Sequence, residues 1–287
     1  MTLLVLRDGD LTIEVLPDVG GRLHRVRGAG RDLLRTPATV ELHRAEPFFW
    51  GAFPMVPWCN RIPGGHLVFD DVDVLLPVNL DGDAIHGEGY DREWEVVDRS
   101  PSAATLRLTS GGPFPWRYSA EETFGVEGGV LTWRLGVRND SATVMPAGVG
   151  IHPWFAAAGL TLRVPAERSY VLDGDKIPIG DPVPVSGAAD MRAEDRPHWG
   201  FDGVLTDLTD AGVDLRWDGA VHARLAFSQG ADHVTVAAFD DFGAVAVEPQ
   251  THATDGIGRL ARGETGAAAA LAPDQSLAVT FTLTIDT

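Results

Sequence analysis

The C-terminal end of the chain alternates apolar and polar residues with a period of two. The apolar positions are Leu277, Val279, Phe281, Leu283 and Ile285, and three of the four residues between them are threonines. A β-strand points successive side chains to opposite faces, so the apolar residues share one face and the threonines share the other. This run therefore requires a sheet with one apolar face.

Similar alternation recurs along the chain, at Leu131–Val137, Leu11–Val15, Thr105–Leu108 and Leu160–Val164. Turn signals rich in Gly, Asp, Asn and Pro lie between such runs, at residues 8–10, 111–113, 127–129, 138–140 and 172–175. The 33 glycines and 19 prolines exclude a helical bundle, because both residues break helices. No linker or repeat divides the chain. We predict an all-β fold, a single large antiparallel β-sandwich formed by residues 1–287 as one domain.

The net charge of −18 disfavours binding to nucleic acid or to anionic membrane surfaces. Cys59 is the only cysteine, so no intramolecular disulfide can form. The apolar N-terminal run lacks the basic residues of a signal peptide, and the alanine-rich stretch at 267–272 is too short to span a bilayer. We expect a cytoplasmic protein with no nucleic-acid or membrane partner. The sequence does not indicate an oligomeric state.

Two segments in the first third of the chain carry candidate ligand-binding residues. Asn60 and Arg61 lie in a Pro/Gly-rich segment, and the guanidinium is a fork-shaped donor for a polar ligand. The alternative is that Arg61 pairs with carboxylates of an acidic surface. His86 lies beside glycine, where backbone can approach a ligand closely. On a strand His86 and Glu88 would share a face and suit a metal ion, whereas in a turn His86 would be a surface residue.

Two later segments carry candidates for proton transfer. Pro153 favours an extended backbone at His152, and histidine is the side chain best suited to proton transfer near neutral pH. The alternative is a core histidine bonded to backbone. Ala246 and Glu248 share a face of a strand of small residues, where burial would raise the pKa of the glutamate and suit it to acid or base work. The alternative is a solvated residue at a strand end that Pro249 marks.

Taken in order, these segments resemble the aldose 1-epimerase (galactose mutarotase) family. The matching residues are Asn60-Arg61-Ile62, Gly64 or Gly65, Phe69, Asn79, Ile85-His86-Gly87, His152-Pro153-Trp154-Phe155, Phe201-Asp202-Gly203-Val204, Thr206-Asp207-Leu208 and Val247-Glu248-Pro249-Gln250-Thr251. The resemblance implies a β-sandwich of the supersandwich type with a sugar site in a cleft on one sheet. Trp154 occupies a position where tyrosine is common in the family, and Val74 lies near a second position where many members have a tyrosine.

The resemblance also implies the roles of the site residues. It makes His152 the general acid and Glu248 the general base, with no metal and no cofactor. The substrate-binding residues that it implies are Arg61, His86, Asp202, Asn60 and Trp154. Trp58 or Phe155 could also stack on the sugar ring. We therefore expect interconversion of the α and β anomers of a free aldohexose such as glucose or galactose, by acid/base opening and closure of the hemiacetal.

Three alternatives stay open at the level of the sequence. A hexose-6-phosphate mutarotase of the same fold would need extra cations near the site; the candidates are Arg92, Arg117 and His66. A non-catalytic sugar-binding protein would not need both His152 and Glu248. A metal-dependent oxygenase or isomerase would use a ligand set made of His86, Glu88, His152 and Glu248.

Overall fold

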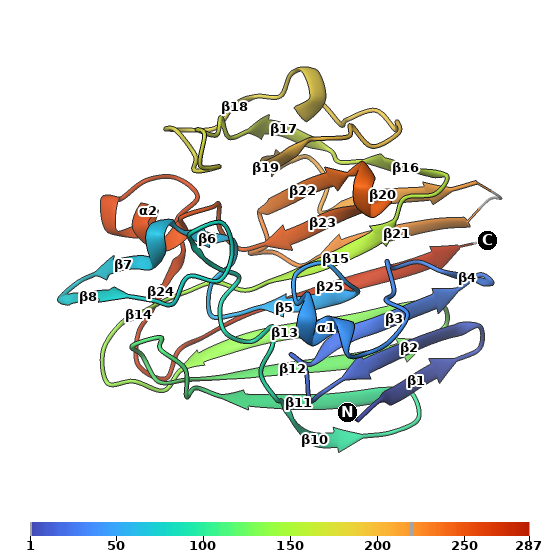
Figure 1. Ribbon diagram of the computed structural model, residues 1–287, viewed down its shortest axis with the longest axis horizontal. Coiled ribbons are helices and arrows are strands. Elements are labelled where there is room, and N and C mark those ends of the chain that lie inside the picture. Colours follow the sequence, from blue (N-terminus) through green and yellow to red (C-terminus); the bar gives the residue numbers. More distant parts are fainter. Residues whose placement is uncertain (1, 219–220, 287) are drawn as a thin grey trace.

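Two large antiparallel sheets dominate the computed structural model, which describes residues 2–218 and 221–286 (Figure 1). Across the eleven-stranded sheet the order is β1 (Leu4–Asp8), β2 (Leu11–Leu16), β3 (Arg22–Gly28), β5 (Ala52–Met55), β15 (Gly150–Ala156), β23 (Ala244–Gln250), β22 (His233–Phe239), β19 (Asp202–Leu208), β17 (Ala166–Ser169) and β18 (Val183–Pro184), with β4 (Arg31–Asp32) beside β3. Across the eight-stranded sheet the order is β10 (Glu95–Arg99), β11 (Ala103–Thr109), β12 (Tyr118–Glu127), β13 (Val130–Asn139), β25 (Ser276–Asp286), β21 (Val221–Phe227), β20 (Gly212–Trp217) and β16 (Leu160–Arg163).

Short elements complete the fold. Three strand pairs are β6 (Arg61–Ile62) with β9 (Ala84–Ile85), β7 (His66–Phe69) with β8 (Val72–Leu75), and β14 (Met145–Ala147) with β24 (Ala269–Leu271). The α-helices of the described residues are α1 (Leu42–Ala45) and α2 (Gly256–Arg262), and 3-10 turns occur at Pro63–Gly65, Gly187–Ala189 and Asp240–Phe242. The all-β prediction is confirmed. In the described ranges, no helix has the length and apolar character needed to cross a membrane.

The two clearest alternating runs of the sequence form β13 and β25, which pair with each other. Trp133 lies opposite Phe281, and Leu131 lies opposite Leu283. All four side chains are buried, whereas the threonines of β25 are half-buried on the other face. Phased apolar residues on two neighbouring strands give the eight-stranded sheet one continuous apolar face, as the period-two pattern predicts.

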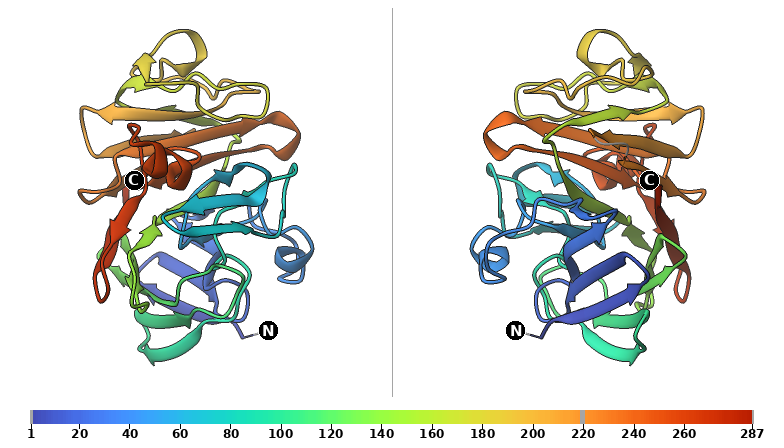
Figure 2. Two further views of the ribbon diagram at one scale, coloured as in Figure 1. Left: turned by 90° about the vertical axis from the view of Figure 1, so that its left-hand side faces the viewer. Right: turned by 90° about the vertical axis from the view of Figure 1, so that its right-hand side faces the viewer.

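The apolar faces of the two large sheets pack against each other. A residual cavity of about 30 Å³ between them is lined by Ile151 and Phe155 from the first sheet and by Trp133 and Phe281 from the second. On the central strands β15, β22 and β23 the opposite face of the eleven-stranded sheet is also buried. Both views of Figure 2 place α1 on one side of the molecule and β25 on the other.

Strands β15 and β23 are therefore buried on both faces. Ile151 and Phe155 of β15 point into the space between the sheets, so His152 and Trp154 point the other way, toward the covering loops. This alternation puts the polar residues of two central strands on the outer face, under a layer of loops.

Candidate active site

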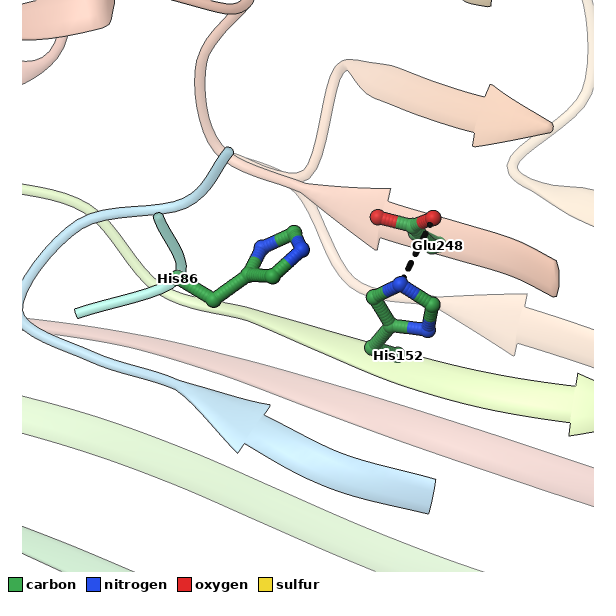
Figure 3. Close-up of side chains that lie close together, drawn as sticks. All are labelled: His86, His152 and Glu248. Atoms are coloured by element: carbon green, nitrogen blue, oxygen red, sulfur yellow. Dashed lines mark ion pairs between the residues drawn. The ribbon is translucent and has the colours of Figure 1, made fainter. Parts of the chain in front are cut away.

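His152 and Glu248 meet because of the register between β15 and β23. The pairing places Gly150 opposite Gln250 and Trp154 opposite Ala246, and His152 and Glu248 lie midway between these pairs. His152 Nε2 is 3.1 Å from Glu248 Oε1 (Figure 3). Strand β23 continues through Pro249, and Glu248 is buried, so the alternative of a solvated strand-end residue is wrong.

Burial controls the protonation of this pair. Desolvation lowers the pKa of His152 to about 3. Desolvation raises the pKa of Glu248 well above its usual value; Asp202 adds to this effect and Arg61 opposes it. Both shifts favour the uncharged form of each group, an imidazole beside a protonated carboxyl. Moving that one proton across the 3.1 Å contact gives an imidazolium and a carboxylate with no change in proton count. The pair can therefore supply an acid and a base together.

His86 presents an N–H group to the same site. It follows β9 and has a left-handed backbone, with φ of 63°. Its Nδ1 accepts a hydrogen bond from the Asn60 backbone N–H at 3.2 Å, and burial lowers its pKa well below the usual value. The ring is therefore neutral, with its proton on Nε2. A Cβ at Gly87 would lie 2.1 Å from the Val56 carbonyl oxygen, so the glycine serves backbone packing and not the approach of a ligand.

The histidines and Glu248 form a cluster that geometry alone would allow to hold a metal ion. One ligand atom from each of His86, His152 and Glu248 lies within 4.8 Å of the others. Glu88 lies elsewhere and accepts hydrogen bonds from the Phe114 N–H and the Tyr118 hydroxyl, so the expected four-ligand set does not form. The Nε2 of His86 carries a proton and offers no lone pair. This donor set suits proton transfer better than metal binding.

Arg61 combines the two alternatives considered for it. Its buried guanidinium is 3.0 Å from a carboxylate oxygen of each of Asp81 and Asp83, and it also lines the cleft. Burial alone would lower its pKa, but the hydrogen bonds with Asp83 and Asp81 outweigh burial and raise it. The Asn60 side chain accepts a hydrogen bond from the Arg61 N–H at 2.9 Å, which fixes the turn that delivers both residues.

The structure brings all seven sequence-predicted residues into one cleft of about 190 Å³. They are Asn60, Arg61, His86, His152, Trp154, Asp202 and Glu248. A cleft of this volume suits a compact ligand. The small side chain of Ala237, directly opposite Ala246 on β22 and β23, leaves room above the sheet.

Aromatic side chains form one wall of the cleft. Phe49, Phe239 and Phe242 join Trp154, whose Nε1–H donates to the Phe48 carbonyl at 2.6 Å, so the indole presents carbon atoms to a ligand. The expectation that Trp58 or Phe155 stacks on the ligand is wrong. Trp58 packs on Phe114 and Phe155 packs on Trp217, and both are part of the core between the sheets.

The cations expected for a phosphorylated ligand lie outside the cleft. Arg92 is 3.8 Å from Glu88, His66 is 2.8 Å from Asp73, and Arg117 donates to the Asp140 carbonyl. Among the described residues that line the cleft, Arg61 and Lys176 carry the positive charge. The sequence motifs do not include Lys176. It is the only lysine in the sequence, and this rarity could have identified it as a candidate.

Comparison with known proteins assigns the chain to a family. The family model of aldose 1-epimerase matches residues 2–251. The chain belongs to the aldose 1-epimerase family. The uncharacterized protein YphB of Escherichia coli K12 is 31% identical over 174 residues, 59% of this chain and 57% of YphB. Galactose mutarotase of Rattus norvegicus is 25% identical over 181 residues, 58% of this chain and 52% of the rat protein. The chain thus matches little more than half the length of either relative.

Solved structures show that the fold is that of galactose mutarotase-like proteins. A galactose mutarotase-like protein from Clostridium acetobutylicum superposes with a TM-score of 0.88 and 19% identity, over 99% of this chain and 95% of that one. The expected resemblance and fold are confirmed. Membership of an aldose 1-epimerase family supports a mutarotase-like function that acts on sugars.

Proposed function

We propose that the protein is a mutarotase that interconverts the α and β anomers of a free, uncharged aldohexose such as glucose or galactose. The observation that carries this proposal is the buried His152–Glu248 pair, 3.1 Å apart in a small cleft that has both polar and aromatic lining residues. Such a pair offers one group that can take a proton and one that can give it, as ring opening requires.

The reaction uses the single proton of the pair. After that proton moves to His152, the Glu248 carboxylate takes the proton of the C1 hydroxyl while the His152 imidazolium donates to the ring oxygen. The bond between C1 and the ring oxygen breaks, and C1 becomes an aldehyde. Rotation about the C1–C2 bond exposes the other carbonyl face, and ring closure reverses both proton transfers. Each transfer contributes about 10²–10⁴-fold to the rate.

The remaining cleft residues hold the sugar in place for this chemistry. The Nε2–H of His86 donates to a hydroxyl oxygen, and Arg61 does the same from the turn after Asn60. Asp202 accepts from a hydroxyl, and the aromatic wall at Trp154 contacts the carbon-bound hydrogens of the ring. Holding C1 and the ring oxygen against the His152–Glu248 pair keeps the proton transfers intramolecular.

The charge pattern favours a free sugar over a sugar phosphate. Arg61 is paired with Asp81 and Asp83, and Lys176 is paired with Asp202 at 2.7 Å. A phosphate dianion would therefore have to displace carboxylates from both cleft cations and then lie beside them. An uncharged hexose needs only hydrogen bonds, which paired charges still donate and accept.

Polarimetry of freshly dissolved α-D-glucose and α-D-galactose tests the proposal, with a chelator present. We expect the protein to speed the approach to the same final rotation for at least one sugar, and to act at least about tenfold less well on glucose 6-phosphate. Acceleration of the phosphate alone would contradict the choice of substrate. No acceleration of any aldose, with binding retained, would favour the sugar-binding alternative.

A further inference from the structure

The only lysine of the chain lines the active-site cleft. Lys176 lies in the loop between β17 and β18, and its Nζ is 2.7 Å from Asp202 Oδ2 and 5.9 Å from the centre of the Phe239 ring. It borders both the cleft and an adjoining open hollow. Every other cationic side chain of Lys or Arg type in this sequence is an arginine, so Lys176 carries the only side-chain ammonium group.

The backbone at Lys176 has an unfavourable conformation for a lysine. Its φ is 65°, in the left-handed region that glycine and asparagine occupy more easily. The turn is already fixed without its side chain, because the Asp173 carboxylate accepts the N–H groups of Asp175 and Ile177 at 2.9 Å each. The side chain is not needed to form the loop, which points to a role for its ammonium group at the cleft.

The depth of the cleft sets which part of a sugar Lys176 can reach. The side chains of His152 and Glu248 are 6% and 3% exposed at the closed end, whereas that of Lys176 is 42% exposed at the open end. The reacting C1 must lie at the closed end, beside the acid/base pair. In a pyranose C4 lies across the ring from C1, so hydroxyls on the C3, C4 and C6 side point toward Lys176.

We propose that Lys176 determines substrate specificity by donating a hydrogen bond to a hydroxyl on the far side of the sugar ring from C1. Asp202, its partner at 2.7 Å, holds the ammonium group at the cleft and accepts from the same or a neighbouring hydroxyl. This inference rests on the proposed function. In this proposal the open end of the cleft recognises the sugar, and the closed end carries out the proton transfers.

A series of deoxy sugars tests the contact. We expect Lys176→Met to raise KM for glucose about tenfold with little change in kcat, since it removes a charged hydrogen-bond donor used throughout the reaction. We expect Lys176→Met to raise KM for 2-deoxyglucose by the same factor. For one of the 3-, 4- or 6-deoxy sugars we expect no rise in KM, because that sugar already lacks the hydroxyl that Lys176 contacts. The proposal would be overturned by an unchanged KM for glucose or by the same rise in KM for all five sugars. It would also be overturned if 2-deoxyglucose were the one sugar whose KM did not rise.

Arg192→Met is the matched control. The Arg192 side chain is 43% exposed and lies 2.8 Å from Asp190, so it resembles Lys176 in exposure and pairing, but it does not line the cleft. We expect its KM to equal that of the wild type. Lys176→Gly separates binding from folding: it relieves the left-handed backbone, so we expect an unchanged or higher Tm together with the raised KM. A lower Tm with normal KM would show a structural role and overturn the proposal.

Chemical protection tests sugar contact without turnover. An acetylating N-hydroxysuccinimide ester can modify only two kinds of amine in this chain, Lys176 and the N-terminal amino group, which serves as an internal control. We expect saturating glucose or galactose to slow acetylation of Lys176 at least about fivefold and to leave the N-terminus unaffected. Equal rates would overturn the inference. Protection of Lys176 without mutarotation would support the contact and contradict the proposed function. Mutarotation without protection would support the proposed function and contradict the contact.

Discussion

Glu122 and Glu248 are buried glutamates in different regions of the molecule, and they share most of their local physics. Each lies in the middle of a strand, burial raises the pKa of each well above its usual value, and one carboxyl oxygen of each lacks a hydrogen-bond partner within the described residues. Glu122 lies in the eight-stranded sheet and Glu248 in the eleven-stranded sheet.

The surroundings of the two carboxyls differ. Glu122 accepts a hydrogen bond from the Trp133 indole at 3.0 Å, and a Cβ at Gly21 would lie 1.7 Å from its other oxygen, so no ligand can approach. Glu248 contacts His152 and borders the cleft. A raised pKa therefore marks burial in both cases. Only the carboxyl that has a proton partner and access to a ligand suits catalysis.

The largest expected effect comes from removing the proton partner of Glu248. His152→Ala should lower kcat at least about 100-fold, because the ring oxygen then receives no positioned proton. Trp133→Phe removes the partner of Glu122 and should leave kcat within about twofold. Polarimetry on folded protein, checked by circular dichroism, measures both. Near wild-type turnover in His152→Ala would remove that residue from the mechanism.

A smaller effect is expected from the polar neighbours that distinguish the cleft from the site of Glu122. Arg61→Ala should raise KM about tenfold with a lesser change in kcat, since a charged hydrogen-bond donor to the sugar is lost. Initial rates over a range of sugar concentrations give both constants. If KM is unchanged, Arg61 serves only to pair with Asp81 and Asp83.

The last effect concerns stability and not turnover, and should be shared by both glutamates. A carboxyl whose pKa is raised by folding stabilises the protein fully below its unfolded pKa, and this contribution is lost as the pH rises toward the folded pKa, by up to about 1.4 kcal/mol per pH unit. Glu122→Gln should therefore flatten the fall in unfolding free energy between pH 5 and 8. Urea unfolding at several pH values measures it; an unaltered slope would mean that Glu122 ionises normally.

Much of the fold could be predicted from the alternation of apolar and polar residues. The same alternation also indicates that Glu122 is buried. Tyr118, Ala120, Phe124 and Val126 are buried on one face of β12, and Glu122 falls in the same phase. A glutamate in an apolar phase signals a buried carboxyl. The strands β13 and β25 were predicted in the same way, because one face of each is apolar and the other polar.

Seven residues that line the cleft could be predicted from motifs, whereas Lys176 and the orientation of the cleft could not. Alternation shows that Ala246 and Glu248 share a face, yet β15 and β23 are covered on both faces, so the sequence does not show which face borders a cleft. For the same reason it could not show that Trp58 points into the core while Asn60, two residues later, lines the cleft. The tautomer of His86 depends on a backbone N–H 26 residues away in the chain.

The most direct test of the account is the turnover of the two isosteric variants Glu248→Gln and Glu122→Gln, measured by polarimetry with freshly dissolved sugar. Each replaces a buried carboxyl by an amide of the same shape, so packing is conserved in both. We expect Glu248→Gln to lose at least about 100-fold in kcat and Glu122→Gln to stay within about twofold of the wild type. Comparable turnover in both variants would contradict the assignment of Glu248 as the base.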